Sequence, residues 1–149
     1  MNNIMHDLEK VKKRLQSSKY TFVLLQNGEV IKVSDKKGIL PFLEMIRDHS
    51  DLMEGAALAD RVIGKAAALL AAGYKVKAIY SDVMSQQARE VLEQYSIFYQ
   101  FDRCVDYIKN RHKSSQCPME KLTEKINDPK IAYHRILQYY KEVLHIQLS

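Results

Sequence analysis

With 149 residues, of which 46% are hydrophobic and 28% charged, the chain has the composition of an ordinary globular protein rather than a disordered one. The length favours a single domain over residues 1–149, and no apolar run approaches the roughly 20 residues that cross a bilayer. The formal net charge is +5, but acidic residues interrupt the basic clusters, so solvated helix faces explain it better than a nucleic-acid surface.

The amino-terminal part of the sequence predicts a helix, a β-hairpin and a second helix. Apolar residues recur every three or four positions from Ile4 to Leu15, which is typical of an amphipathic helix. Two β-rich runs, Tyr20–Leu25 and Glu29–Val33, flank Asn27-Gly28, a pair that tolerates the positive φ of a tight hairpin turn. The next segment, 42–49, predicts a short helix with Pro41 in its first turn.

The middle of the sequence predicts a buried helix followed by alternating strands and helices. Residues 57–72 are small or aliphatic almost throughout, and Gly73 is suited to end a helix there. The predicted strands are Val76–Tyr80 and Ser96–Phe101, and the predicted helices are Ser85–Tyr95, Asp102–Arg111, Pro118–Ile126 and Pro129–Ile146. This alternation implies an α/β fold, with ligand sites at the carboxyl ends of the strands near helix N-termini.

Five segments stand in a specific order and spacing: GEVI, GILPFLEMI, ADRVIGKAAALLAAG, AIYSDVMSQQAREVLEQYSI and CPMEK. They resemble a family of uncharacterised prokaryotic proteins, a domain of unknown function, that is placed in the cytidine-deaminase-like superfamily. The most specific pieces are Asp60-x-x-x-Gly64-Lys65-Ala-Ala-Ala68 and Cys117-Pro-Met-Glu120. The resemblance covers about residues 18–122, so residues 123–149 form a C-terminal helical extension outside it.

The resemblance implies a three-layer α/β/α fold with a mixed sheet, to which extra N- and C-terminal helices are added. It also implies that DRVIGKAAALL occupies the place of the zinc-binding His-x-Glu helix of active deaminases, and that residues 81–85 form a turn in the place of Pro-Cys-x-x-Cys. The first segment has neither the histidine nor the glutamate, and the second has no cysteine. Zinc-dependent deamination needs about three protein ligands and a general acid/base glutamate. No metal and no cofactor is therefore expected.

Lys65, Cys117 and Glu120 are the candidate catalytic residues. Lys65 lies inside an apolar helix, where it either forms an ion pair or faces a pocket as a ligand-binding or reactive amine. Cys117 precedes a first-turn proline, so it is either the plain N-cap of a helix, with Glu120 completing a capping box, or a thiol activated by the helix dipole.

Asp60, Lys65, Ser81 and Asp82 are the candidate ligand-binding residues. Asp60 is either the N-terminal partner of the predicted helix or a ligand contact. Ser81 and Asp82 follow a strand and precede a helix that Ser85 can cap, so their turn either prepares that cap or presents backbone N–H groups to an anion.

Three functions are compatible with these residues. The first is a zinc-free deaminase-fold protein that binds a small polar or nucleotide-like ligand in the cleft at the strand ends. The second is a non-catalytic structural or regulatory module on the same fold, and the third, less favoured, is a basic protein associated with nucleic acid.

Partners and location are predicted from the ends of the chain and from its cysteines. The last helix carries tyrosines 133, 139 and 140, which favour a homodimer through this helix. Two isolated cysteines and an amino terminus without an apolar block indicate a cytoplasmic protein with no membrane partner.

Overall fold

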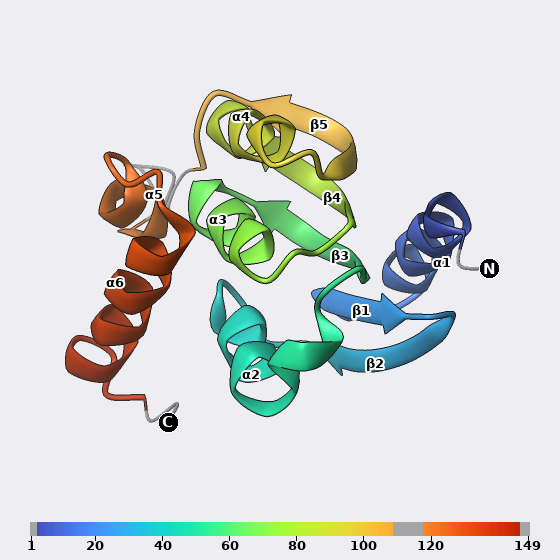
Figure 1. Ribbon diagram of the computed structural model, residues 1–149, viewed down its shortest axis with the longest axis horizontal. Coiled ribbons are helices and arrows are strands. Elements are labelled where there is room, and N and C mark those ends of the chain that lie inside the picture. Colours follow the sequence, from blue (N-terminus) through green and yellow to red (C-terminus); the bar gives the residue numbers. More distant parts are fainter. Residues whose placement is uncertain (1–2, 109–117, 147–149) are drawn as a thin grey trace.

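The computed structural model describes residues 3–108 and 118–146. Its main elements, in chain order, are α1 (Ile4–Gln16), β1 (Phe22–Gln26), β2 (Glu29–Ser34), α2 (Leu40–His49), β3 (Ala57–Ile63), α3 (Lys65–Gly73), β4 (Ala78–Ser85), α4 (Gln86–Gln94), β5 (Phe98–Val105), α5 (Pro118–Thr123) and α6 (Pro129–Glu142). A single 3₁₀ turn, Ser50–Leu52, follows α2. Figure 1 shows their arrangement.

Five strands form one mixed sheet in the order β2-β1-β3-β4-β5. The hairpin strands are antiparallel, and β1 also pairs antiparallel with β3, whereas β3, β4 and β5 run parallel. The hairpin turn is the predicted one, since Asn27 and Gly28 have φ values of 51° and 82°. The predicted α/β class, the mixed sheet and the hairpin are confirmed.

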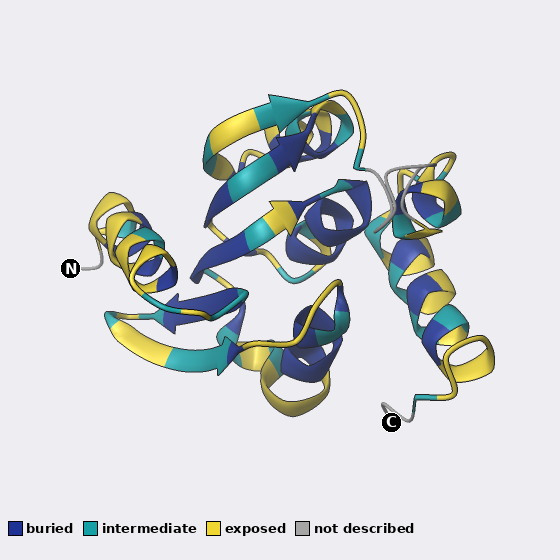
Figure 2. Cartoon of the chain, turned by 180° about the vertical axis from the view of Figure 1, so that it is seen from behind, coloured by how far each residue is buried: buried dark blue, intermediate teal, exposed yellow. Residues whose placement is uncertain are grey.

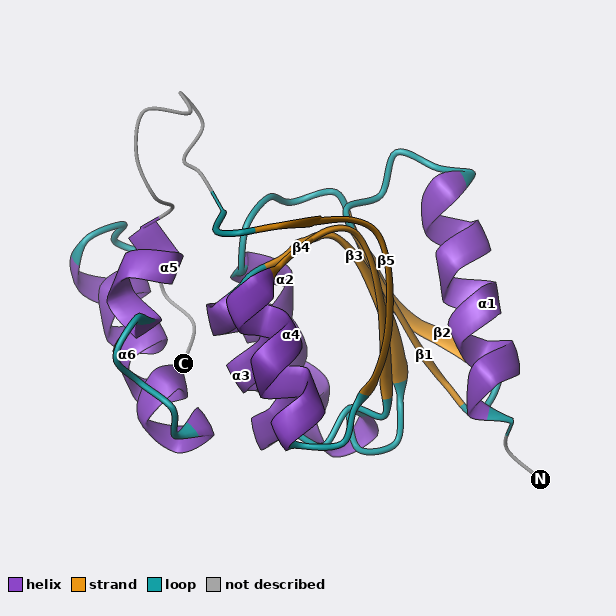
Figure 3. Ribbon diagram, turned by 90° about the horizontal axis from the view of Figure 1, so that it is seen from above, coloured by secondary structure: helices purple, strands orange, loops and turns teal. Residues whose placement is uncertain are grey.

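The helices lie in layers on the two faces of this sheet (Figure 3). Among the described helices, α1 covers one face, whereas α2, α3 and α4 cover the other, and α5 and α6 form a further layer beyond α3. The larger core cluster lies between the sheet and α2–α4 and includes Phe22, Phe42 and Leu69. A smaller one joins Leu8, Val11 and Leu15 of α1 to β1, β3 and β4.

The predicted helix over residues 57–72 is wrong in its first half. Residues 57–63 form strand β3, and the helix begins only at Lys65, after Gly64. The first three residues, 57–59, are buried and pack into the core clusters on both faces of the sheet. This part of the strand therefore lacks the alternation of apolar and polar residues that distinguishes a strand from a buried helix.

Two further predictions fail where strands run longer than expected. Strand β4 continues to Ser85, so residues 81–85 are a strand and not a turn. Strand β5 continues to Val105 and residues 106–108 are not helical, so the predicted Asp102–Arg111 helix is wrong for residues 102–108, and residues 109–111 lie outside the described part.

The C-terminal helix packs against the protein's own α3. Ala132, Ile136 and Tyr140 are buried on the side of α6 that faces α3, and the opposite side is exposed (Figure 2). Tyr133 packs edge-on against Tyr74, with ring centroids 6.1 Å apart. The tyrosines thus contribute to packing within one chain, and the homodimer through this helix stays a prediction. In the described residues, no helix combines the length and the apolar character that a membrane crossing requires.

Candidate functional site

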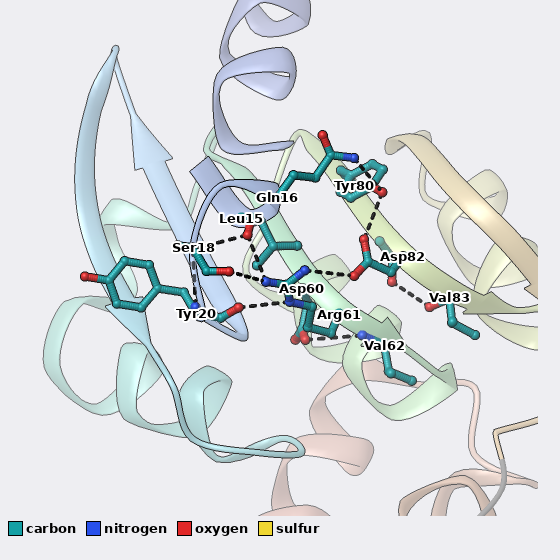
Figure 4. Close-up of polar contacts among 11 residues, drawn as sticks. Leu15, Gln16, Ser18, Tyr20, Asp60, Arg61, Val62, Tyr80, Asp82 and Val83 are labelled. Atoms are coloured by element: carbon teal, nitrogen blue, oxygen red, sulfur yellow. Dashed lines mark hydrogen bonds and ion pairs between the residues drawn. The ribbon is translucent and has the colours of Figure 1, made fainter. Parts of the chain in front are cut away.

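The structure distributes the predicted site residues over three places. Asp60 and Ser81 are buried partners on the neighbouring strands β3 and β4. Asp82 is partly exposed on β4 and bonds with Arg61 of β3 and Tyr80 of β4, which in turn contact the end of α1, as Figure 4 shows. Lys65 and Glu120 meet at the start of α3. Cys117 lies outside the described residues.

Arg61, which the sequence analysis did not single out, organises the junction between α1 and the sheet. Its guanidinium donates hydrogen bonds to the backbone carbonyls of Leu15 (2.8 Å), Ser18 (2.9 Å) and Tyr20 (2.9 Å). The first of these carbonyls belongs to the last turn of α1, where a helix leaves its carbonyls without intrahelical partners. Arg61 therefore caps α1 and fixes it to β3.

Asp82 completes this cluster as the acceptor for Arg61. Its Oδ2 lies 3.1 Å from the Nη1 atom of Arg61, and its Oδ1 accepts a hydrogen bond of 2.9 Å from the Tyr80 hydroxyl. The Tyr80 hydroxyl in turn accepts a 3.4 Å hydrogen bond from Gln16 of α1. Burial and the bond to Asp82 raise the pKa of Tyr80. Asp82 thus contacts the protein's own side chains, in an arrangement that holds two strands and a helix together.

The Asp60 carboxyl of β3 is perturbed by burial. Its side chain lies among buried residues, and burial raises the pKa of this carboxyl well above the ordinary value, although the neighbouring Val62 and Arg61 amides act in the opposite direction. The Val62 amide donates to Asp60 Oδ1 over 3.4 Å. Perturbed carboxyls of this kind occur at functional sites and also in structural networks. Asp60 is not at a helix N-terminus, because it lies within β3.

The two serines of β4 serve the local structure. Ser81 is fully buried, and its hydroxyl donates to the Val83 carbonyl over 2.5 Å. Ser85 accepts a hydrogen bond of 3.1 Å from the Ala88 amide and is the N-cap of α4, so the predicted cap is confirmed. The side chains of Ser81 and Ser85 are therefore engaged with the chain itself.

Lys65 and Glu120 bring together the two most specific segments of the resemblance. The Lys65 amide, the first of α3, donates a 2.7 Å hydrogen bond to Oε1 of Glu120, which is 1% exposed. The Lys65 amine is also buried and donates to the Glu124 carbonyl over 2.9 Å. Glu120 therefore caps α3, a helix more than 50 residues earlier in the chain, and both residues join α3 to the α5 region.

Gly64 makes this contact sterically possible. Its φ of −102° and ψ of −174° are accessible to any residue, so the backbone does not require glycine here. A Cβ atom at this position, however, would overlap Glu120 Oε1 and lie 3.1 Å from Glu120 Cδ and 3.2 Å from Ile108 Cγ1. The glycine thus allows the carboxylate to approach the first turn of α3.

The described side chains do not form the zinc site that active deaminases carry. Within residues 3–108 and 118–146, no group of three or more His, Cys, Asp or Glu side chains could hold a metal ion. The carboxylates of Asp60, Asp82 and Glu120 instead have contacts with backbone amides, a guanidinium and a hydroxyl.

The sheet of two antiparallel and two parallel pairings, with helices on both faces, defines an α/β protein of mixed topology. The chain belongs to the TM1506 family, described as a domain of unknown function (DUF1893), whose model matches residues 10–140. This match extends beyond residues 18–122 at both ends and includes most of α1 and α6. The predicted family is confirmed.

A solved structure has the same fold. The crystal structure of TM1506, a DUF1893 family protein from Thermotoga maritima determined at 2.70 Å, is similar with a TM-score of 0.84. The two proteins are 24% identical, and the similarity covers 92% of each chain. At this identity the likeness shows the fold alone. No curated protein matches the chain.

Proposed function

We propose that this protein is a non-catalytic module, structural or regulatory, on a cytidine-deaminase-like scaffold. The contact between Lys65 and Glu120 carries the proposal. A helix N-terminus is a place where an anionic ligand can bind, because its first amides have no intrahelical partners. At α3 the first of these amides is occupied by the carboxylate of Glu120, at 2.7 Å. The chain itself thus supplies the anion.

The orientation of the two candidate catalytic side chains supports the same conclusion. The Lys65 amine is 6% exposed and bonded to a backbone carbonyl, and the Glu120 carboxylate is 1% exposed and bonded to a backbone amide. Both groups are directed at the chain rather than at a space that a substrate could enter. A buried polar group with such a partner stabilises a fold, and losing the partner costs about 1–3 kcal/mol.

The alternative, a small polar or nucleotide-like ligand in the cleft at the strand ends, stays a prediction. It would use Lys65, Cys117 and Glu120 as catalytic groups, and it would require α5 to move away from the start of α3. The structural or regulatory function needs no such movement, and for this reason we prefer it.

Hydrogen exchange of the Lys65 amide tests whether the start of α3 is closed. In the wild-type protein we expect this amide to exchange slowly, at a rate similar to the buried amides of α3. In Glu120→Ala it should exchange much faster, whereas Glu120→Gln should keep much of the protection because the amide oxygen can still accept the hydrogen bond. Fast exchange in the folded wild-type protein would contradict the closure.

An assay for ammonia release tests whether the module is non-catalytic. We would incubate the full chain with cytidine, adenosine, guanosine and their monophosphates, with and without added Zn²⁺, and measure bound metal in parallel. The expected result is no turnover and no stoichiometric metal. Turnover that is lost in Lys65→Met and Glu120→Gln, but kept in the distant control Lys141→Met, would refute the proposal.

A further inference from the structure

A groove on the other side of the sheet contains a separate set of charged residues. It lies between α1 and the β1–β2 hairpin and has a volume of about 700 Å³. This is within the range of about 300–1,000 Å³ that is typical of small-molecule sites. Its lining combines basic side chains of α1 with apolar side chains of α1 and the hairpin. Because α1 covers the face of the sheet opposite α3, the groove and the Lys65–Glu120 contact are independent (Figures 1 and 3).

The wall of the groove is cationic. Lys10, Lys13 and Arg14 all line it, and among the described residues no acidic side chain does. The Lys10 amine donates to the Gly28 carbonyl over 3.2 Å and so spans the groove from α1 to the hairpin turn. Lys13 and Arg14 are exposed, and neither forms an ion pair with any residue of the described part of the chain. Lys10 and Arg14 are four residues apart and share one face of the helix.

The floor of the groove is apolar. Val11, Val23 and Leu25 are at most 1% exposed, whereas Val30 of β2 remains 41% exposed beside them. Val30 is the sheet partner of Leu25, so the two residues extend one apolar surface toward the edge of the sheet. Within residues 3–108 and 118–146, no aromatic side chain lines the groove. Proteins that bind single-stranded nucleic acids stack the bases on aromatic rings, so this lining does not favour a polynucleotide.

We propose that this groove binds a small organic di- or triphosphate. The phosphates would contact Lys13 and Arg14, with Lys10 at the hairpin end, because a guanidinium and an ammonium are the side chains that suit phosphate oxygens. The apolar or aromatic body of the ligand would cover Val30, the floor residue whose side chain is exposed. Three cations without a carboxylate favour a ligand with more than one negative charge, and the apolar floor favours an ester over the inorganic anion.

Isothermal titration of the full chain tests the proposal with three probes at one ionic strength. The probes are a nucleoside triphosphate, a five-carbon prenyl diphosphate and inorganic pyrophosphate. We expect saturable 1:1 binding of at least one ester, at least about tenfold tighter than pyrophosphate, which corresponds to about 1.4 kcal/mol. The ester that binds shows whether a nucleoside or a prenyl group fits the apolar floor of the groove.

Matched variants locate the binding in the groove. Lys13→Gln/Arg14→Gln should weaken the ester at least about tenfold. Arg135→Gln/Lys141→Gln, which removes the same two charges from exposed positions of α6, should leave the affinity unchanged. Val30→Glu, at an exposed floor position, should also abolish binding without unfolding the protein.

Three results would overturn the proposal. The first is that neither ester binds. The second is that pyrophosphate binds as tightly as the esters, which would leave the floor without a role. The third is that both double variants weaken binding equally, which would mean that only the net charge matters. None of these results bears on the closure of α3, which the exchange of the Lys65 amide measures separately.

Discussion

Basic side chains are buried and bonded at the start of α3, whereas those in the groove beside α1 are exposed. At α3, Lys65 is 6% exposed, and its amine bonds to the Glu124 carbonyl while Glu120 caps the helix. At α1, Lys13 and Arg14 are exposed and have no ion-pair partner in the described residues. A buried charge must have its partner within the fold, since burial without one is costly, whereas an exposed charge can take a partner from outside. The difference indicates that the protein's own residues occupy the start of α3, whereas the exposed cations of α1 can accept a partner from outside.

The largest effect is expected from filling the space beside Glu120. Gly64→Ala should lower the free energy of unfolding by about 1–3 kcal/mol, because the added methyl group would overlap the Glu120 carboxylate. Urea denaturation followed by circular dichroism measures this change. The backbone conformation of Gly64 is open to alanine, so strain in φ and ψ does not contribute.

A double-mutant cycle isolates the steric cause. In a Glu120→Ala background most of the overlap is removed, and Gly64→Ala should then cost much less, so the two substitutions should couple by about 1 kcal/mol or more. Additive costs would mean that Gly64 is needed for another reason. In that case, the contact with Glu120 would not be what closes the start of α3, and the two regions would differ less.

The next largest loss of stability is expected from Arg61, on the side of the sheet where the groove lies. Arg61→Ala should destabilise the protein by about 2 kcal/mol, because three backbone carbonyls and the Asp82 carboxylate each lose a charged donor. Arg61→Lys should recover only part of this loss, since an ammonium cannot reproduce the planar set of donors. Arg103→Ala, an exposed position on β5, is the control and should change stability by less than about 0.5 kcal/mol.

Arg61→Ala should affect ligand binding in the groove as well as stability. Helix α1 is one wall of the groove, and Arg61 fixes its last turn to β3. Arg61→Ala should therefore also weaken binding of an organic polyphosphate, although Arg61 does not line the groove. If the variant were destabilised while its affinity remained at the wild-type value, α1 would be positioned by its apolar contacts alone.

The hairpin and the family could be predicted from the sequence because both depend on local signals. Asn27-Gly28 specifies its turn by backbone preference, and the segments around Lys65 and Glu120 are contiguous motifs. Strand β3 could not be predicted, since its start, residues 57–59, is buried on both faces of the sheet and has no alternating pattern. The role of Arg61 was also hidden, because its partners are mostly backbone carbonyls that any residue provides. Which contacts Lys65 makes depends on α5, 55 residues away from it in sequence.

The smallest effect is expected at Asp60, and it depends on pH. Burial raises the pKa of this carboxyl well above its ordinary value, so the folded protein holds the proton more tightly than the unfolded chain does. The contribution of Asp60 to stability is therefore complete below the ordinary pKa of about 3.9 and is lost as the pH rises toward the raised value.

Asp60→Asn has no proton to lose and should melt a few degrees above the wild-type protein at neutral pH, with a difference that shrinks toward pH 4. Asp51→Asn, at an exposed position, should show no such trend. Thermal melts of the three proteins between pH 4 and 8 measure it, and a difference that is constant across this range would mean that Asp60 ionises freely and has access to solvent. In that case the strand ends would be open near β3, and the contrast between the two regions would be confined to the first turn of α3.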